Sequence, residues 1–185
     1  MKTIIETERL IIAEVDLNDT GFIVQLLNSP TWLQFIGDKG VRNVEQAQKY
    51  IEESLIGAYR KNGFGLYKLC VKESLVPIGL CGFLQRDYLD SPDIGFALLP
   101  EYESKGFMYE AGSALMDYGT SKLKLECVLA IVMPQNGKSR KLLERIGLHQ
   151  IGTVTPKGGT EELLLFSNKK AAQIERLSPI IFIFN

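Results

Sequence analysis

The sequence predicts a single domain of the mixed α/β (α+β) class, in which helices flank a mostly antiparallel sheet. Three apolar runs follow one another with short turns between residues 64 and 99, as in an antiparallel meander. A helical segment then leads to another apolar run at residues 126–133, which implies a parallel crossover. The length of 185 residues suits one domain with its own core. We expect that domain at residues 1–168, with residues 169–185 as a C-terminal extension.

The N-terminal region should begin with a strand and continue into a helix. Residues 4–12 are rich in isoleucine and leucine, so the first strand is expected there. Asn18 or Asp19 can cap a short helix that ends at the Ser-Pro pair at residues 29–30. Residues 32–40 are expected to be irregular.

The clearest helix signal follows. Asn43 is a good N-cap, and Gln46 stands three positions later, as in a capping box. Apolar residues then recur at helical spacing until the Asn-Gly pair at residues 62–63. Two further helices are expected at residues 106–122 and 136–146. Strands are expected at residues 64–71, 77–84, 94–99, 126–133, 150–155 and 161–166.

Composition excludes several classes of function. Lys plus Arg number 21 and Asp plus Glu 22, so a net charge of −1 gives no bulk attraction for nucleic acid or for an anionic membrane. No apolar run is long enough to span a bilayer, and we expect a cytoplasmic protein. The three cysteines, all in apolar runs, are expected to be reduced core residues. His149 is the only histidine, so no multi-histidine metal site is expected.

Residues 94–116 carry the chemical signal. An apolar strand ends at Leu99, a polar turn follows, and a helix begins at Gly106. Such a junction gathers unpaired backbone N–H groups and the positive end of a helix dipole, which together favour a phosphate. Lys105 adds a formal positive charge. Taken alone, one glycine at such a turn more often serves the turn than a ligand.

Three motifs resemble the GNAT superfamily of N-acetyltransferases, in particular its branch of ribosomal-protein N-terminal acetyltransferases. Residues 95–111 read GFALLPEYESKGFMYEA and resemble that branch's coenzyme A motif. Residues 136–148 read NGKSRKLLERIGL and resemble a second motif, while TERL at residues 7–10 resembles the family's opening. The motifs stand in the family's order. The resemblance implies a GNAT-like fold with a splayed pair of parallel strands, and acetyl-CoA as co-substrate.

The resemblance also assigns roles to residues. Leu98 and Leu99 would pair their backbone with the pantetheine arm, and Asn136 would hydrogen-bond that arm. Ser139 would lie near the sulfur and assist the leaving thiolate. The pyrophosphate would be held by backbone N–H groups of Glu103, Ser104, Lys105, Gly106, Phe107 and Met108.

The amine acceptor needs a base and a pocket. Asp93 is the candidate base, because it opens the strand whose end would bind the cofactor and the family often has Glu there; a turn role after Pro92 is equally open. Trp32, Phe35 and Tyr88 are candidate wall residues for a small-molecule or peptide amine. No metal is expected, and the protein is expected to be a monomer or a homodimer.

Two other functions stay open. Glu103 and Met108 depart from the family's usual Gln or Arg and small residue, and Leu143 stands where many relatives outside this branch have a tyrosine acid. These departures favour a catalytically weak or inactive acyl-CoA-binding sensor or scaffold of the same fold. The third alternative is an unrelated mixed α/β binding domain.

Overall fold

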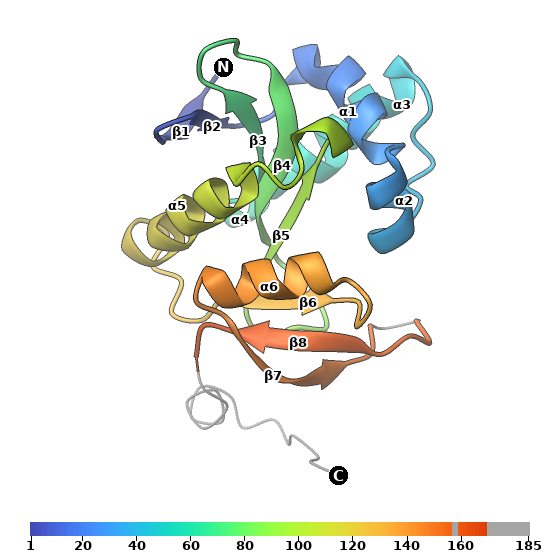
Figure 1. The fold of residues 1–185 in the computed structure, drawn as a ribbon. Coiled ribbons are helices and arrows are strands. Elements are labelled where there is room, and N and C mark those ends of the chain that lie inside the picture. The colour runs from blue at the N-terminus through green and yellow to red at the C-terminus, as the bar shows by residue number, and fades with distance from the viewer. Residues whose placement is uncertain (157–158, 170–185) are drawn as a thin grey trace. The chain divides into compact units, whose positions relative to one another are not determined.

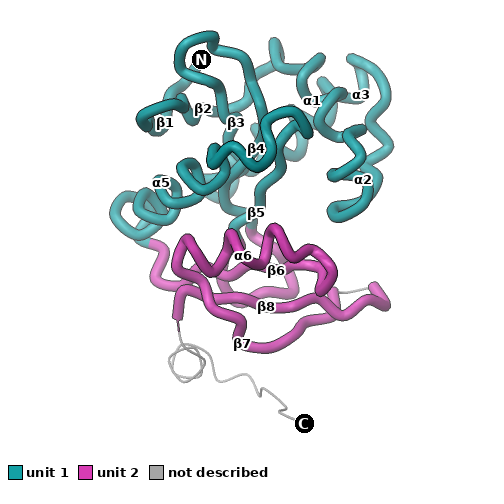
Figure 2. The backbone as a smooth tube through the Cα atoms, viewed as in Figure 1, with its two compact units in different colours: residues 1–84, 94–124 teal, residues 85–93, 125–185 magenta. Residues whose placement is uncertain are grey.

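The computed structural model describes residues 1–156 and 159–169, and its backbone gathers into two compact units (Figures 1 and 2). The first unit comprises residues 1–84 and 94–124, and the second comprises residues 85–93 and the described residues after 124. The fold is a mixed, mostly antiparallel β-structure with flanking helices, as the sequence predicts. The expected C-terminal extension lies, apart from Lys169, outside the described residues.

The strands of the first unit are ordered β1-β2-β3-β4-β5, with antiparallel pairing from β1 to β4. Their bounds are β1 Thr3–Glu6, β2 Leu10–Ala13, β3 Leu66–Val71, β4 Pro77–Leu84 and β5 Asp93–Leu98, whose first residue belongs to the second unit. The single strand expected at residues 4–12 was wrong, because the chain turns at residues 7–9 and forms a hairpin. A Cβ atom at Gly79 would lie 2.3 Å from the Ala97 carbonyl oxygen, so glycine permits the close approach of β4 and β5.

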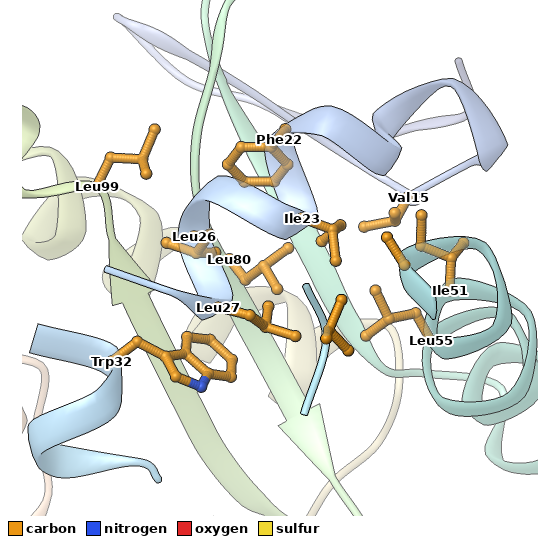
Figure 3. Close-up of a cluster of buried hydrophobic side chains, with 12 residues drawn as sticks. Val15, Phe22, Ile23, Leu26, Leu27, Trp32, Ile51, Leu55, Leu80 and Leu99 are labelled. Carbon is orange, nitrogen blue, oxygen red and sulfur yellow. The ribbon is translucent and has the colours of Figure 1, made fainter. Parts of the chain in front are cut away.

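Helices cover both faces of this sheet. On one face, a cluster that includes Leu80 of β4 packs against α1 Thr20–Leu27, α2 Pro30–Phe35 and α3 Val44–Tyr50 (Figure 3). On the other face lies α5 Phe107–Ser121, where the absence of a side chain on Gly119 makes room for the Phe83 ring. The alternation of Leu80 and Phe83 between faces follows from the two-residue period of a strand.

The expectations around α1 are confirmed in part. Asp19, one of the two expected caps, is the N-cap of α1, but its side chain makes no capping hydrogen bond; Asp16 instead caps the short 3₁₀ segment η1 Leu17–Asp19 that leads into α1. The helix α1 ends before the Ser29–Pro30 pair, with Asn28 as its C-cap, as expected. The irregular stretch expected from residue 32 was wrong at its start, because Pro30 begins α2, where a proline in the first turn costs no hydrogen bond.

The capped helix at Asn43 is confirmed, and its middle is unusual. Asn43 accepts a hydrogen bond from the Gln46 backbone N–H at 2.9 Å. The helix passes from α3 through the π-helical segment η2 Ile51–Ile56 to α4 Gly57–Asn62. Ala47, Ile51 and Leu55 are four residues apart along this helix, and all three lie on its buried side.

The strands of the second unit are ordered β6-β8-β7, all antiparallel, with bounds β6 Leu129–Val132, β7 His149–Val154 and β8 Leu163–Ser167. Asp93 pairs with Leu129 in parallel, which confirms the expected parallel pair. The helix α6 Gly137–Arg145 packs against β6. A small cluster of Leu89, Cys127, Leu129 and Leu165 forms the apolar core that the loop before β5 helps to cover.

The cysteines are buried and free, as expected. Burial raises the pKa of the Cys81 thiol to about 12, so this thiol is a core group and not a nucleophile at neutral pH. His149 is the exposed first residue of β7. None of the described helices has the length and apolar character needed to cross a bilayer.

Candidate functional site

The turn between β5 and α5 has an unusual backbone conformation. The short 3₁₀ segment η3 Pro100–Tyr102 follows β5, and Gly106 is the N-cap of α5. Ser104 has φ 60° and Gly106 has φ 81°, both in the left-handed region. Alternating left-handed residues turn successive N–H groups toward one side of a chain, the arrangement that forms an anion-binding concavity.

The N–H groups of this turn are available to a ligand. Within residues 1–156 and 159–169, none of the backbone N–H groups from Ser104 to Met108 donates to a protein acceptor. The helix dipole of the fifteen-residue α5 adds partial positive charge at the same place. The turn therefore fits a pyrophosphate, and the expected contacts of residues 103–108 are geometrically compatible except at Glu103, whose N–H donates to the Pro100 carbonyl oxygen at 3.2 Å.

Aromatic and charged side chains pack around the turn. Tyr102 and Phe107 lie with ring centroids 6.3 Å apart. The Lys105 ammonium lies 5.6 Å from the Tyr102 ring centroid, and the Arg9 guanidinium lies 4.5 Å from that of Phe107. The Glu103 carboxylate accepts a hydrogen bond from the Thr31 hydroxyl of α2 at 2.8 Å. Glu103 is thus held by a neighbouring helix, which the sequence gives no sign of.

At the end of β5, the backbone N–H and C=O groups of Leu98 are more available to a ligand than those of Leu99. The Leu99 N–H donates to the Ile78 carbonyl oxygen of β4 at 2.8 Å, and its own carbonyl oxygen accepts from the Tyr102 N–H at 3.0 Å. Because backbone groups of successive strand residues point to opposite sides, those of Leu98 point away from β4. Leu98 is therefore the better placed of the two to pair with an extended ligand.

The second unit holds Asn136 and Ser139 at the start of α6. Asn136 is the N-cap, and its Oδ1 accepts a hydrogen bond from the Ser139 N–H at 3.1 Å. The Asn136 amide nitrogen and the half-buried Ser139 hydroxyl are the polar groups that remain for a ligand. Leu143 is 1% exposed and faces the core, so the described α6 places no acid at that position.

Asp93 is the most deeply buried carboxylate of the described residues, at 1% exposure. Its two oxygens accept hydrogen bonds from Arg86 Nε at 2.9 and 3.0 Å, and Arg86 Nη1 donates to the Tyr88 hydroxyl at 3.3 Å. Burial raises the pKa of the Asp93 carboxyl above its ordinary value, and the opposing influence of the Arg86 guanidinium does not cancel that rise. The sequence shows Arg86 only as a loop residue, so its partnership with Asp93 is a finding of the structure.

The candidate wall residues differ in exposure. Trp32 is 3% exposed within the cluster drawn in Figure 3, and its indole Nε1 donates to the Gly37 carbonyl oxygen at 3.1 Å. Phe35 and Tyr88 are half-buried, so a ligand reaches them more readily than it reaches Trp32. Among the described residues, no group of three or more His, Cys, Asp or Glu side chains is arranged to hold a metal ion.

Comparison with known proteins gives consistent matches. A family model described as an acetyltransferase (GNAT) domain matches residues 9–149. The uncharacterized N-acetyltransferase p20 of Bacillus licheniformis is 30% identical over 170 residues, which are 87% of this chain and 93% of that protein. An acetyltransferase structure from Agrobacterium tumefaciens is 24% identical with a TM-score of 0.73, covering 90% of this chain and 94% of the other. The structure of RimL, a ribosomal L7/L12 α-N-protein acetyltransferase in complex with coenzyme A, is 16% identical with a TM-score of 0.78, covering 92% and 99%.

Proposed function

The chain belongs to the GNAT acetyltransferase family, and from that premise we propose that it transfers an acetyl group from acetyl-CoA to a primary amine by direct attack on the thioester. The observation that carries the proposal is the turn at residues 104–108, with two left-handed residues and N–H groups that donate to no protein acceptor in the described part of the chain. The coenzyme A in the RimL structure supports the same kind of ligand here.

Acetyl-CoA supplies an activated thioester when it is bound. The backbone N–H groups of residues 104–108 would hold its pyrophosphate, with Lys105 contributing positive charge. Leu98 would pair with the pantetheine arm, as an added strand pairs with a sheet edge. Asn136 would donate its side-chain amide to the same arm. Much of the acceleration would come from holding the reactants together.

Proton transfer is the second requirement. The attacking amine must be neutral, and Asp93 is the proposed base, whose raised pKa suits that role. Asp93 is 1% exposed and accepts a bifurcated hydrogen bond from Arg86 Nε, so we propose that a water molecule relays the proton or that Arg86 moves aside when the amine binds. Ser139 would donate a hydrogen bond to the departing thiolate, since Leu143 has no proton to give.

The acceptor class is a primary amine, either a protein N-terminus or a small molecule. Phe35 and Tyr88 are the proposed wall residues, because their rings are partly accessible. Aromatic walls suit the apolar part of an amine substrate, and Tyr88 adds a hydroxyl that Arg86 already contacts.

Two measurements test the proposal: a thermal shift with acetyl-CoA and ATP, and a turnover assay with a panel of amines. Acetyl-CoA should raise the melting temperature well above any effect of ATP at equal concentration, since a ligand at a hundred times its Kd stabilises by about 2.7 kcal/mol. In a panel of peptide N-termini, polyamines, amino sugars and amino acids, at least one amine should be acetylated with release of free coenzyme A thiol. Equal shifts with ATP, or no shift, would contradict a dedicated coenzyme A site.

The alternative function is an acyl-CoA-binding sensor or scaffold that does not turn over. The Arg86–Asp93 pair favours it, because the Asp93 carboxylate is 1% exposed and already hydrogen-bonded to Arg86, so a bound amine has no direct access to it in this structure. Acetyl-CoA binding without thiol release from any amine of the panel would support the sensor and contradict the transferase.

A further inference from the structure

The TERL segment at the N-terminus lies against the start of α5. Glu110, the fourth residue of α5, accepts three hydrogen bonds from this segment. The donors are the Thr7 hydroxyl at 2.6 Å, the Arg9 backbone N–H at 2.8 Å and Arg9 Nε at 2.7 Å. A carboxylate with three donors fixes the position of its helix turn firmly.

The same guanidinium contacts Lys105 and Phe107, on either side of Gly106 in the phosphate turn. Arg9 Nη1 donates to the Lys105 carbonyl oxygen at 3.1 Å. Arg9 Nη2 lies 3.4 Å from the place where a Cβ atom of Gly106 would stand, and the guanidinium carbon lies over the Phe107 ring. One side chain thus connects the N-terminal hairpin, the turn and the first helical turn.

The hydrogen bond between Arg9 and the Lys105 carbonyl oxygen also orients the Gly106 N–H, which would face the ligand. The Lys105 carbonyl and the Gly106 N–H belong to one planar trans peptide, so they point in opposite directions. Holding the carbonyl oxygen on Arg9 therefore directs the Gly106 N–H to the other side of the chain. A turn that contains Ser104 at φ 60° needs such external support, because a residue with a side chain is strained there.

We propose that Arg9 is a positioning residue that orders the turn at residues 104–107 for the pyrophosphate of acetyl-CoA. The inference rests on the proposed function. It gives a role to the TERL segment at residues 7–10, which takes no part in the proposed acetyl transfer itself. Arg9 acts through geometry and not through net charge, because Glu110 neutralises it. A preformed turn lowers the ordering cost of binding, which appears as affinity.

Two substitutions separate geometry from charge. Arg9→Lys keeps the positive charge but loses the planar fork that reaches Glu110 and Lys105 together. Arg9→Ala loses both. Each should weaken coenzyme A binding by about tenfold, while the KM for S-acetylpantetheine, which lacks the pyrophosphate, stays unchanged. Lys2→Ala is the matched control, because it breaks another ion pair of the same hairpin, Lys2–Glu14 at 2.6 Å, away from the turn.

Amide hydrogen exchange in the ligand-free protein provides an independent measurement. Both Arg9 variants should exchange faster than the Lys2 variant at residues 104–107, with the β3 and β4 amides unchanged in protection. Wild-type coenzyme A affinity in Arg9→Lys, an equal loss toward S-acetylpantetheine, or unchanged exchange at the turn would overturn the inference. If wild-type protein binds neither coenzyme A nor acetyl-CoA, the proposed function fails, and the exchange data alone then decide whether Arg9 orders the turn.

Discussion

Both carboxylate oxygens of Asp93 accept hydrogen bonds from a single nitrogen, Nε of Arg86, at 2.9 and 3.0 Å. The pair joins the first residue of β5 to the loop that precedes it. Experiment can separate the proposed role of Asp93 as proton acceptor for the amine from its observed contact with Arg86, which lies beside Tyr88.

Asp93→Asn should lower kcat/KM by roughly 10²- to 10⁴-fold if Asp93 is the base. The loss should shrink as pH rises, because more of the acceptor amine is already neutral. Arg86→Gln serves as the comparison, since it breaks the Arg86–Asp93 ion pair but leaves the carboxylate. If both variants lose activity by the same factor at every pH, Asp93 acts through its contact with Arg86 and not as a base. The measurement is a pH–rate profile from pH 6 to 9, with acetyl-CoA binding checked separately.

Glu103→Gln should tighten acetyl-CoA binding by about two- to fivefold, because it removes a like charge from the phosphate turn. Glutamine keeps the side-chain oxygen that accepts from Thr31, so the tie to α2 survives the substitution. The gain should fall as salt is added, since screening weakens the repulsion in the wild type. Glu101→Gln, which removes a charge from the exposed η3 segment, is the control. A gain that is equal in both variants, or insensitive to salt, would mean that the Glu103 charge does not face the ligand.

Gly106 should matter more than Lys105 for cofactor binding. Gly106→Ala forces a side chain into φ 81°, at a cost of about 1–2 kcal/mol, although only Arg9 lies within 4 Å of the added atom. Gly106→Pro cannot adopt that angle and also removes an N–H donor, so it should abolish the stabilisation by acetyl-CoA. Lys105→Ala should reduce it only partly. A larger loss in Lys105→Ala than in Gly106→Ala, by thermal shift, would mean that charge and not the backbone holds the phosphates.

Local signals in the sequence predicted much of the fold. The capped helix at Asn43 and the helix expected to begin at Gly106 depend on neighbours within a few positions. Both are found, the second beginning at Phe107 with Gly106 as its N-cap. The same kind of signal was present but misinterpreted at Pro30, since a serine followed by proline also begins a helix.

The relations that position the candidate site could not be predicted in this way. Arg9 and Glu110 are 101 residues apart in the sequence, and the Thr31–Glu103 contact spans 72. No periodicity or spacing brings such pairs together, because they meet only when the sheet and helices have packed. Arg86 and Asp93 are close in sequence, but each is an ordinary residue for a loop or a strand start. The turn itself was found because strand, glycine and helix are contiguous.

A buried ion pair in the first unit gives a stability prediction. Lys68 of β3 is 5% exposed, and its ammonium lies 2.6 Å from Asp19 and 3.2 Å from Asp16. Burial lowers the pKa of Lys68, but the two carboxylates together raise it by more than burial lowers it. The net pKa lies above the ordinary value, so Lys68 is charged at neutral pH. Asp19→Ala should cost about 3 kcal/mol of unfolding free energy, because a buried charge loses its principal partner. Lys68→Met combined with Asp19→Leu should recover at least half of that loss. Chemical denaturation measures both, and a double variant less stable than Asp19→Ala would contradict the argument.

Glu110 should make the stability of the protein depend on acid pH. Burial raises the pKa of this carboxyl, but hydrogen bonds from Thr7 and Arg9 lower it by more, so the folded protein holds it below the ordinary value of 4.5. The unfolded chain then binds a proton before the folded protein does, and stability falls as pH drops through that interval. At pH 7 wild-type protein should exceed Glu110→Gln by about 1 kcal/mol. The difference is fully present above the unfolded pKa and should disappear as pH falls through the folded pKa. Urea unfolding between pH 7 and pH 3 measures it, with Arg9→Gln as the background in which the difference should shrink. A difference that stays constant down to pH 3 would mean that the charge of Glu110 contributes nothing to the contact with Arg9.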